Sequence, residues 1–332
     1  MKKITIGLTV LTFLFITAIV PAGAAEPVNI SVISGPFGTG SYVLSSALEE
    51  MSKKYSKTIQ VNASETPGLV FNTKKLNKEP ELKKNMFMSY TVGINYLATH
   101  GLKPFKQKYP SAMLIANYNL GAVWLASLDP QVNSKKALIG KKIALGRGTQ
   151  ILWAIEPRLI ITHGWELNEK IGIQYVGTKP AARALLDGLV DAAVVGGYAD
   201  PIRGQLKPSP QTIELLASGK KLYHISWGKE AVQKVIDKGI PIAQLQLTAN
   251  TIEGQSNALE VFCDPIAWCA YPEFDEKLAY EVTKMIIKNV DEFKEYHALG
   301  KLMSKKSLIY GWEPKDIHPG ALKAYKEAEI IK

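Results

Sequence analysis

Short apolar runs alternate along the chain with longer segments whose apolar residues recur at helical spacing. In the first third of the chain, these patterns predict strand 28–33, helix 41–55, strand 59–63, helix 68–76, strand 85–88 and helix 92–100. Strands that alternate with helices in this way are typical of a parallel sheet with helices on both faces. The pattern therefore indicates an α/β fold.

After an apolar run at 113–117 the same cycle begins again. It predicts strand 141–145, helix 152–163, strand 173–176, helix 180–186 and strand 191–195. A later strand at 258–269 and a helix at 275–290 do not begin a third sheet. We expect this last segment to return to the first unit.

The two cycles predict two α/β lobes joined by two crossing hinge segments. We expect residues 26–118 and 258–332 to form lobe 1, and residues 119–257 to form lobe 2. Ligands of such sheets lie at the carboxyl ends of the strands. Two lobes that face each other make a ligand cleft, which can close by a hinge.

The N-terminus has the pattern of a secretory signal peptide. Lys2 and Lys3 precede an apolar run at 4–20, and small residues follow at 22–24. This pattern predicts a cleaved signal peptide over residues 1–25, with a retained membrane anchor as the alternative. We expect the mature chain in the periplasm, where nucleic acid is not a reasonable partner.

The net charge of +10 comes mostly from lysines spread along the chain, which indicates a solvated surface. A basic balance mildly favours anionic ligands. The two cysteines, Cys263 and Cys269, could pair in an oxidising compartment. On one extended strand they would lie roughly 20 Å apart, too far to bond, whereas a turn at Asp264-Pro265 would bring them closer. The sequence leaves this choice open.

The segment Gly35–Tyr42 joins the first predicted strand to the first predicted helix. Free N–H groups at a helix start favour an anion, but the glycine spacing fits neither a P-loop nor a dinucleotide-binding turn. A plain strand-to-helix turn is the alternative to a carboxylate-binding turn. As ligand-binding residues we predict Gly38, Thr39, Gly40, Ser41 and Tyr42.

A similar turn follows the strand at 141–145 in the second unit. There Arg147 offers a planar guanidinium suited to a carboxylate, with an exposed surface charge as the alternative. The chain's four arginines all fall within 119–257. The predicted ligand-binding residues of this turn are Arg147, Gly148, Thr149 and Gln150.

Two further strand ends complete the predicted site. The hydroxyl-bearing residues Ser89, Tyr90 and Thr91 follow the third strand, and Tyr198 lies in an expected turn at 196–201. None of the five histidines has a partner at a spacing that suggests a nucleophile or a metal site. We therefore expect no enzyme activity, no metal and no cofactor. A secreted enzyme is the rival from another class.

The chain resembles the TAXI family, the solute-binding subunits of one branch of the tripartite ATP-independent periplasmic (TRAP) transporters. The resemblance rests on segments that occur in the family's order, namely Gly38–Tyr42, Gly68–Asn72, Leu138–Ile143, Leu186–Ala192 and His318–Tyr325. It implies a type II periplasmic binding protein fold. It also implies capture of a small organic anion, such as glutamate, a dicarboxylate or an oxo acid. The resemblance further implies that the protein delivers this solute to a membrane permease driven by an ion gradient.

By the same resemblance, residues 38–42 and 89–91 would line one wall of the cleft and residues 146–150 the other. We expect a monomer that works with TRAP permease subunits. The alternative is the same fold serving an ABC transporter or a membrane sensor.

Overall fold

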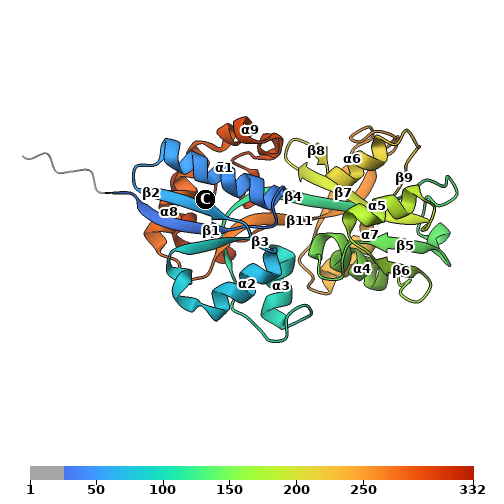
Figure 1. Cartoon of the computed structure of the whole chain (residues 1–332), viewed down its shortest axis with the longest axis horizontal. Helices are drawn as coiled ribbons and strands as arrows, with labels where there is room; N and C mark the ends of the chain where they lie inside the picture. Colours follow the sequence, from blue (N-terminus) through green and yellow to red (C-terminus); the bar gives the residue numbers. More distant parts are fainter. Residues whose placement is uncertain (1–25) are drawn as a thin grey trace, which may run out of the picture.

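The computed structural model describes residues 26–332, so the predicted signal peptide over 1–25 lies outside it. Within 26–332, no helix is both long enough and apolar enough to cross a lipid bilayer. Figure 1 shows an elongated molecule with a group of elements at each end. We call the group that holds residues 28–91 the first lobe and the group that holds residues 142–200 the second lobe.

The first lobe is built on three parallel strands. They are β1 (Val28–Ile33), β2 (Ile59–Ser64) and β3 (Met86–Thr91), with β1 in the middle. The helices that follow them are α1 (Gly40–Tyr55), α2 (Leu69–Lys78) and α3 (Val92–His100). The predicted strand–helix cycle is confirmed here, with small shifts in the boundaries.

The second lobe repeats this arrangement with β5 (Lys142–Leu145), β6 (Gly172–Tyr175) and β7 (Ala192–Asp200), which are parallel to one another. Shorter strands extend its edges: β8 (Gln205–Pro208), β9 (Tyr223–Ile225) and β10 (Ala243–Leu247). Its regular helices are α5 (Thr178–Leu186), α6 (Pro210–Leu216) and α7 (Lys229–Asp237).

Two long antiparallel strands, β4 (Met113–Ser127) and β11 (Leu259–Ala270), run from one lobe to the other (Figure 1). β11 pairs with β3 in the first lobe, and β4 pairs with β7 in the second, so one sheet has the order β2-β1-β3-β11-β4-β7-β5-β6. The sheet is therefore mixed rather than wholly parallel. β4 passes without interruption through 118–119, and the lobe boundaries placed there and at 257–258 stay a prediction.

The pairing of β11 with β4 is irregular at two places. Its register shifts between Ile266 and Ala267, and again between Trp268 and Cys269. Such irregularities bend a strand and increase its local twist. They lie on the first-lobe side of β11, where the strand also pairs with β3.

The chain after β11 packs against the first lobe, as its colour in Figure 1 shows. Its helices are α8 (Glu276–Lys288), α9 (Phe293–Tyr296) and α10 (Pro319–Glu327). α8 lies against α1 and α10. Trp268 of β11 anchors this side of the core, because its ring centroid lies 4.7 Å from that of Tyr118 and 5.7 Å from that of Phe293.

One prediction of local structure is wrong, and another holds only in part. The segment 196–200 continues β7 and is not a turn, because Gly196 and Gly197 let the neighbouring strands approach. A Cβ at Gly196 would collide with the carbonyl oxygen of Ala122, and one at Gly197 with that of Lys207. The helix at 152–163 is not uniform, as described below. The chain also does not turn at Asp264-Pro265, which lies inside β11.

Cys263 and Cys269 are both buried free thiols on β11. Because the strand is continuous between them, the separation expected for an extended chain applies. The structure therefore favours the unpaired alternative that the sequence left open.

Candidate functional site

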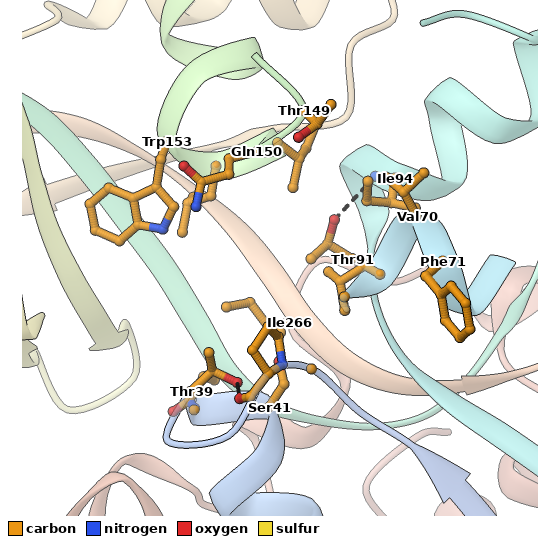
Figure 2. Close-up of a pocket in the computed structure, with 18 of the residues that line it drawn as sticks. Thr39, Ser41, Val70, Phe71, Thr91, Ile94, Thr149, Gln150, Trp153 and Ile266 are labelled. Atoms are coloured by element: carbon orange, nitrogen blue, oxygen red, sulfur yellow. Dashed lines mark hydrogen bonds between the residues drawn. The ribbon is translucent and has the colours of Figure 1, made fainter. Parts of the chain in front are cut away.

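A pocket with a volume of about 460 Å³ lies between the lobes, where both contribute walls (Figure 2). This volume is in the range of small-molecule sites. Its polar lining residues on the first-lobe side are Thr39, Ser41, Thr91 and Tyr118. From β4 and the second lobe come Asn119, Thr149, Gln150 and Tyr198. The pocket therefore gathers donors from the ends of several strands.

Helices begin at this pocket from both lobes. Their first residues, or the caps before them, line it: Thr39 and Gly40 for α1, Gly68 and Leu69 for α2, Thr91 for α3, and Gln150 and Ile151 for the helical run at 151–164. The first amides of a helix have no acceptor inside the helix, and the helix dipole makes this end positive. Amides at these helix starts are therefore candidate donors to a ligand, although the Gly93 and Ile94 amides of α3 already donate to Asp264 and Thr91. The lining has no basic side chain.

The start of α1 is fixed by Thr39. Its Oγ1 accepts a hydrogen bond from the amide of Tyr42 at 3.3 Å and donates to the carbonyl of Pro36 at 2.7 Å. Thr39, Gly40 and Ser41 line the pocket, as predicted for a ligand-binding turn. Gly38 and Tyr42 are not in the lining, and the Tyr42 ring packs on Phe37 with centroids 5.0 Å apart.

The hydroxyl run at the end of β3 contributes one residue to the pocket. Thr91 caps α3, because its Oγ1 accepts from the amide of Ile94 at 3.1 Å (Figure 2). Ser89 and Tyr90 are fully buried and lie outside the lining. The hydroxyl of Ser89 faces that of Ser45 on α1 at 3.5 Å, which gives it a packing role.

In the second lobe, the turn at 146–150 is held by the helical run that follows it. Pro157 has no N–H, so the carbonyl of Trp153 one turn earlier has no α-helical donor. It accepts instead from the amide of Gly146 at 2.8 Å. The run consists of a π-helix at Ile151–Ile155, α4 (Glu156–Leu159) and a second π-helix at Ile160–Gly164. Such π segments are frequent at functional sites.

Two of the four residues predicted in this turn line the pocket. They are Thr149 and Gln150, and Gln150 also accepts a hydrogen bond from the amide of Arg147 at 2.7 Å. Arg147 and Gly148 are exposed and outside the lining. The Arg147 side chain lies over Gly177, with its Cγ 3.6 Å from the position of a Cβ there. The structure therefore does not bring Arg147 to the pocket.

Asn119 is a pocket residue that sequence reasoning missed. Its side chain is 2% exposed, and neither Oδ1 nor Nδ2 has a hydrogen-bond partner. Buried polar atoms are normally paired, and leaving them unpaired costs free energy. Because Asn119 lines the pocket, a bound solute would supply the missing partners. The signal in the sequence is a pair of asparagines, Asn117 and Asn119, within the mostly apolar strand at 113–127.

The neighbouring side chains hold this wall in place. The Tyr118 hydroxyl donates to Ser41 Oγ at 2.9 Å, and the Trp268 indole N–H donates to Ser45 Oγ at 3.0 Å. Tyr198 also lines the pocket, although from within β7 rather than from a turn. Burial raises the pKa of Tyr198, so its hydroxyl stays a neutral donor at neutral pH.

Two buried carboxyl groups lie directly behind the pocket wall. Asp264 of β11 accepts from the amide of Gly93 at 3.3 Å, and a Cβ on Gly93 would collide with Glu156 of α4. Burial and the neighbouring Asp264 charge raise the pKa of Glu156, and burial raises the pKa of Asp264 to about 7. Such neighbours share a proton near neutral pH. Neither residue had been singled out from the sequence.

Residues 26–332 contain no cluster of three or more His, Cys, Asp or Glu side chains that could hold a metal ion. The pocket lining also has no nucleophile beside a base.

Comparison with known proteins agrees with this geometry. Residues 32–328 match a family model described as the NMT1-like family. A solved TctC solute-binding protein from Polaromonas is 12% identical, with a TM-score of 0.51 over 86% of this chain and 89% of that one. MatC from Rhodopseudomonas palustris, solved with bound malate, is 14% identical, with a TM-score of 0.47 over 92% of this chain and 97% of that one. The likeness to the Polaromonas protein shows the two-lobed fold of periplasmic solute-binding proteins, as predicted, and says nothing about the solute.

Proposed function

Because the chain belongs to the NMT1-like family and has the fold of periplasmic solute-binding proteins, we propose that it is the solute receptor of a membrane transporter. More narrowly, we propose a TAXI-type subunit of a TRAP transporter, which works in the periplasm and delivers its solute to an ion-gradient-driven permease. The order of the TAXI-like segments between Gly38 and Tyr325 supports the narrower proposal.

The solute that we propose is a small organic anion. One observation carries this proposal: helix starts from both lobes surround the unpartnered side chain of Asn119. Amides at helix starts stabilise a carboxylate, and the Asn119 Nδ2 can donate to it. Contacts from both lobes would favour the closed arrangement of the lobes over the open one. The permease would recognise that closed arrangement.

Calorimetric titration of residues 26–332 would test this proposal. We expect at least one acid among glutamate, dicarboxylates, oxo acids and simple monocarboxylates to bind and to raise the melting temperature, because a ligand of the folded state stabilises it. Neutral amides and sugars should not bind. If only neutral compounds bind, the proposal that the solute is an anion is wrong, and the proposal that the protein is a solute receptor stands.

Asn119→Asp sharpens this test because it keeps the shape of the side chain and adds a negative charge. We expect it to abolish acid binding. Asn257→Asp, at an exposed position outside the pocket lining, is the matched control and should bind as the parent chain does. Equal binding by both variants would place the solute elsewhere.

Arg147→Ala compares the sequence prediction with the pocket. If Arg147 contacts the solute, truncating its side chain should weaken solute binding as much as truncating Asn119. From its position over Gly177, we expect only a small change in affinity. A large loss would show that Arg147 reaches the solute when the lobes close.

A further inference from the structure

Apolar side chains make up most of the pocket lining, and its polar groups come from helix starts and from the strand residues Tyr118, Asn119 and Tyr198. Side chains of Val70 and Phe71 from α2, Ile94 from α3, and Ile151 and Trp153 from the second lobe line the remainder, with Ile266 between them (Figure 2). Among residues 26–332, no lysine, arginine, histidine, aspartate or glutamate side chain is part of the lining. A solute in this pocket thus meets several neutral polar groups, mainly apolar side chains and no charged one.

This distribution is unfavourable for a second charge on the solute. A second carboxylate would find no cationic side chain in the lining to pair with, and desolvating an unpaired charge is costly. An ammonium group would be repelled by the same helix ends that attract the carboxylate. Two acidic side chains outside the lining, Glu156 and Asp264, are buried beside Gly93 and Ile151.

We propose that the solute is a monocarboxylate with an apolar body, and not an amino acid or a dicarboxylate. This inference rests on the proposed function, which supplies the anion and the receptor. The carboxylate would accept from the first amides of α1 and from the Asn119 Nδ2. The hydrocarbon body would extend along Ile266 toward Ile94 and Phe71 (Figure 2).

A series of six-carbon probes tests the charge pattern at constant chain length. Hexanoate is the expected ligand. Adipate adds a second carboxylate, 6-aminohexanoate adds a terminal ammonium, norleucine adds an ammonium beside the carboxylate, and hexanamide removes the charge. We expect calorimetry at pH 7.5 to show that hexanoate binds at least tenfold more tightly than each of the others.

The length of the monocarboxylate gives an independent readout. Each methylene added from butyrate to hexanoate should lower the dissociation constant about fourfold, because this factor corresponds to the transfer free energy of one buried CH₂ group. A dissociation constant that does not change with length would overturn the apolar enclosure.

Two exposed phenylalanines provide a matched pair of variants. Phe71 lines the pocket and is 43% exposed, and Phe37 lies outside the lining and is 75% exposed. Phe71→Lys places a cation at the apolar end, so it should weaken hexanoate and strengthen adipate. Phe37→Lys adds the same charge nearby and should leave the ratio of the two affinities unchanged.

The outcomes separate this inference from the proposed function. Tighter binding of adipate, glutamate or norleucine than of hexanoate would overturn the monocarboxylate and keep the anion receptor. Equal binding of hexanamide and hexanoate would overturn the anion itself. If no acid in the series binds, the monocarboxylate is overturned, and the anion is overturned as well only if glutamate, the other dicarboxylates and the oxo acids also fail to bind.

Discussion

Two asparagines two residues apart on β4 have opposite environments. Asn117 donates to the carbonyls of Ser307 and Tyr310, at 3.1 and 2.8 Å, and accepts from the Trp312 indole at 2.8 Å. Asn119 is equally buried and has no partner at either side-chain atom. A buried polar side chain without a partner lowers the stability of the solute-free protein, and such residues are typical of binding sites.

This contrast predicts that removing the two side chains changes the stability of the protein by different amounts. Asn117→Ala should lower the free energy of unfolding by about 3 kcal/mol, because it leaves several buried groups without partners. Asn119→Ala should change it by less than about 1 kcal/mol, because no hydrogen bond is lost. Urea denaturation of the solute-free protein measures both. A similar loss in the two variants would show that Asn119 has an internal partner.

At the scale of elements, the start of the helical run at 151–164 depends on Pro157. Replacing it with alanine supplies an N–H that can donate to the Trp153 carbonyl, in competition with the amide of Gly146. The turn at 146–150 would then lose a hydrogen bond that holds it. We expect Pro157→Ala to weaken solute binding severalfold while the protein stays folded.

Hydrogen exchange at the Gly146 amide and the solute affinity measure this effect together. Pro210→Ala is the control, because Pro210 occupies the first position of α6, where a helix lacks an acceptor for the N–H in any case. Unchanged exchange at Gly146 in Pro157→Ala would show that the proline does not direct this hydrogen bond.

Most elements could be predicted from the sequence because their apolar spacing is local. β1, α1 and α3 follow this spacing closely. The errors arise where tertiary contacts decide the structure. Gly196 and Gly197 resemble a turn in the sequence, but they extend β7 because strands on both sides come too close for a Cβ. In the π-helical run, the carbonyl of Trp153 accepts from the amide of Gly146 in the preceding turn, a contact that the apolar spacing does not indicate.

The candidate site could be predicted in part for the same reason. A glycine-rich join between strand and helix is a local signal, so Thr39, Gly40 and Ser41 were identified. The unpaired state of Asn119 depends on what surrounds it in space. The position of Arg147 depends on Gly177, thirty residues later in the chain.

At the scale of the whole molecule, the pair of Glu156 and Asp264 links stability to pH. Burial raises the pKa of both groups in the folded protein, from ordinary values of 4.5 for Glu156 and 3.8 for Asp264. The stabilisation from their protonated forms is fully present below these unfolded values. It is lost as the pH rises through the folded pKa of Asp264, about 7. The free energy of unfolding should therefore fall between about pH 4 and pH 8.

The double variant Glu156→Gln with Asp264→Asn should lose this dependence and be the more stable protein at pH 8. The comparison with the parent chain isolates the pair, because His224 and His318, whose pKa values burial lowers, act in the opposite direction in both proteins. Glu313→Gln at an exposed site is the control. Parallel curves of unfolding free energy against pH for the parent and the double variant would exclude a role for the pair.

The irregular register of β11 also has a mechanical consequence. Ile266 stands at the first shift and is paired with Asn119, so the pocket wall coincides with a place where the pairing of the two long strands is irregular. A solute in contact with both residues would stiffen the sheet there. Occupancy would then slow amide exchange along β4 and β11 in both lobes, far from any atom of the solute.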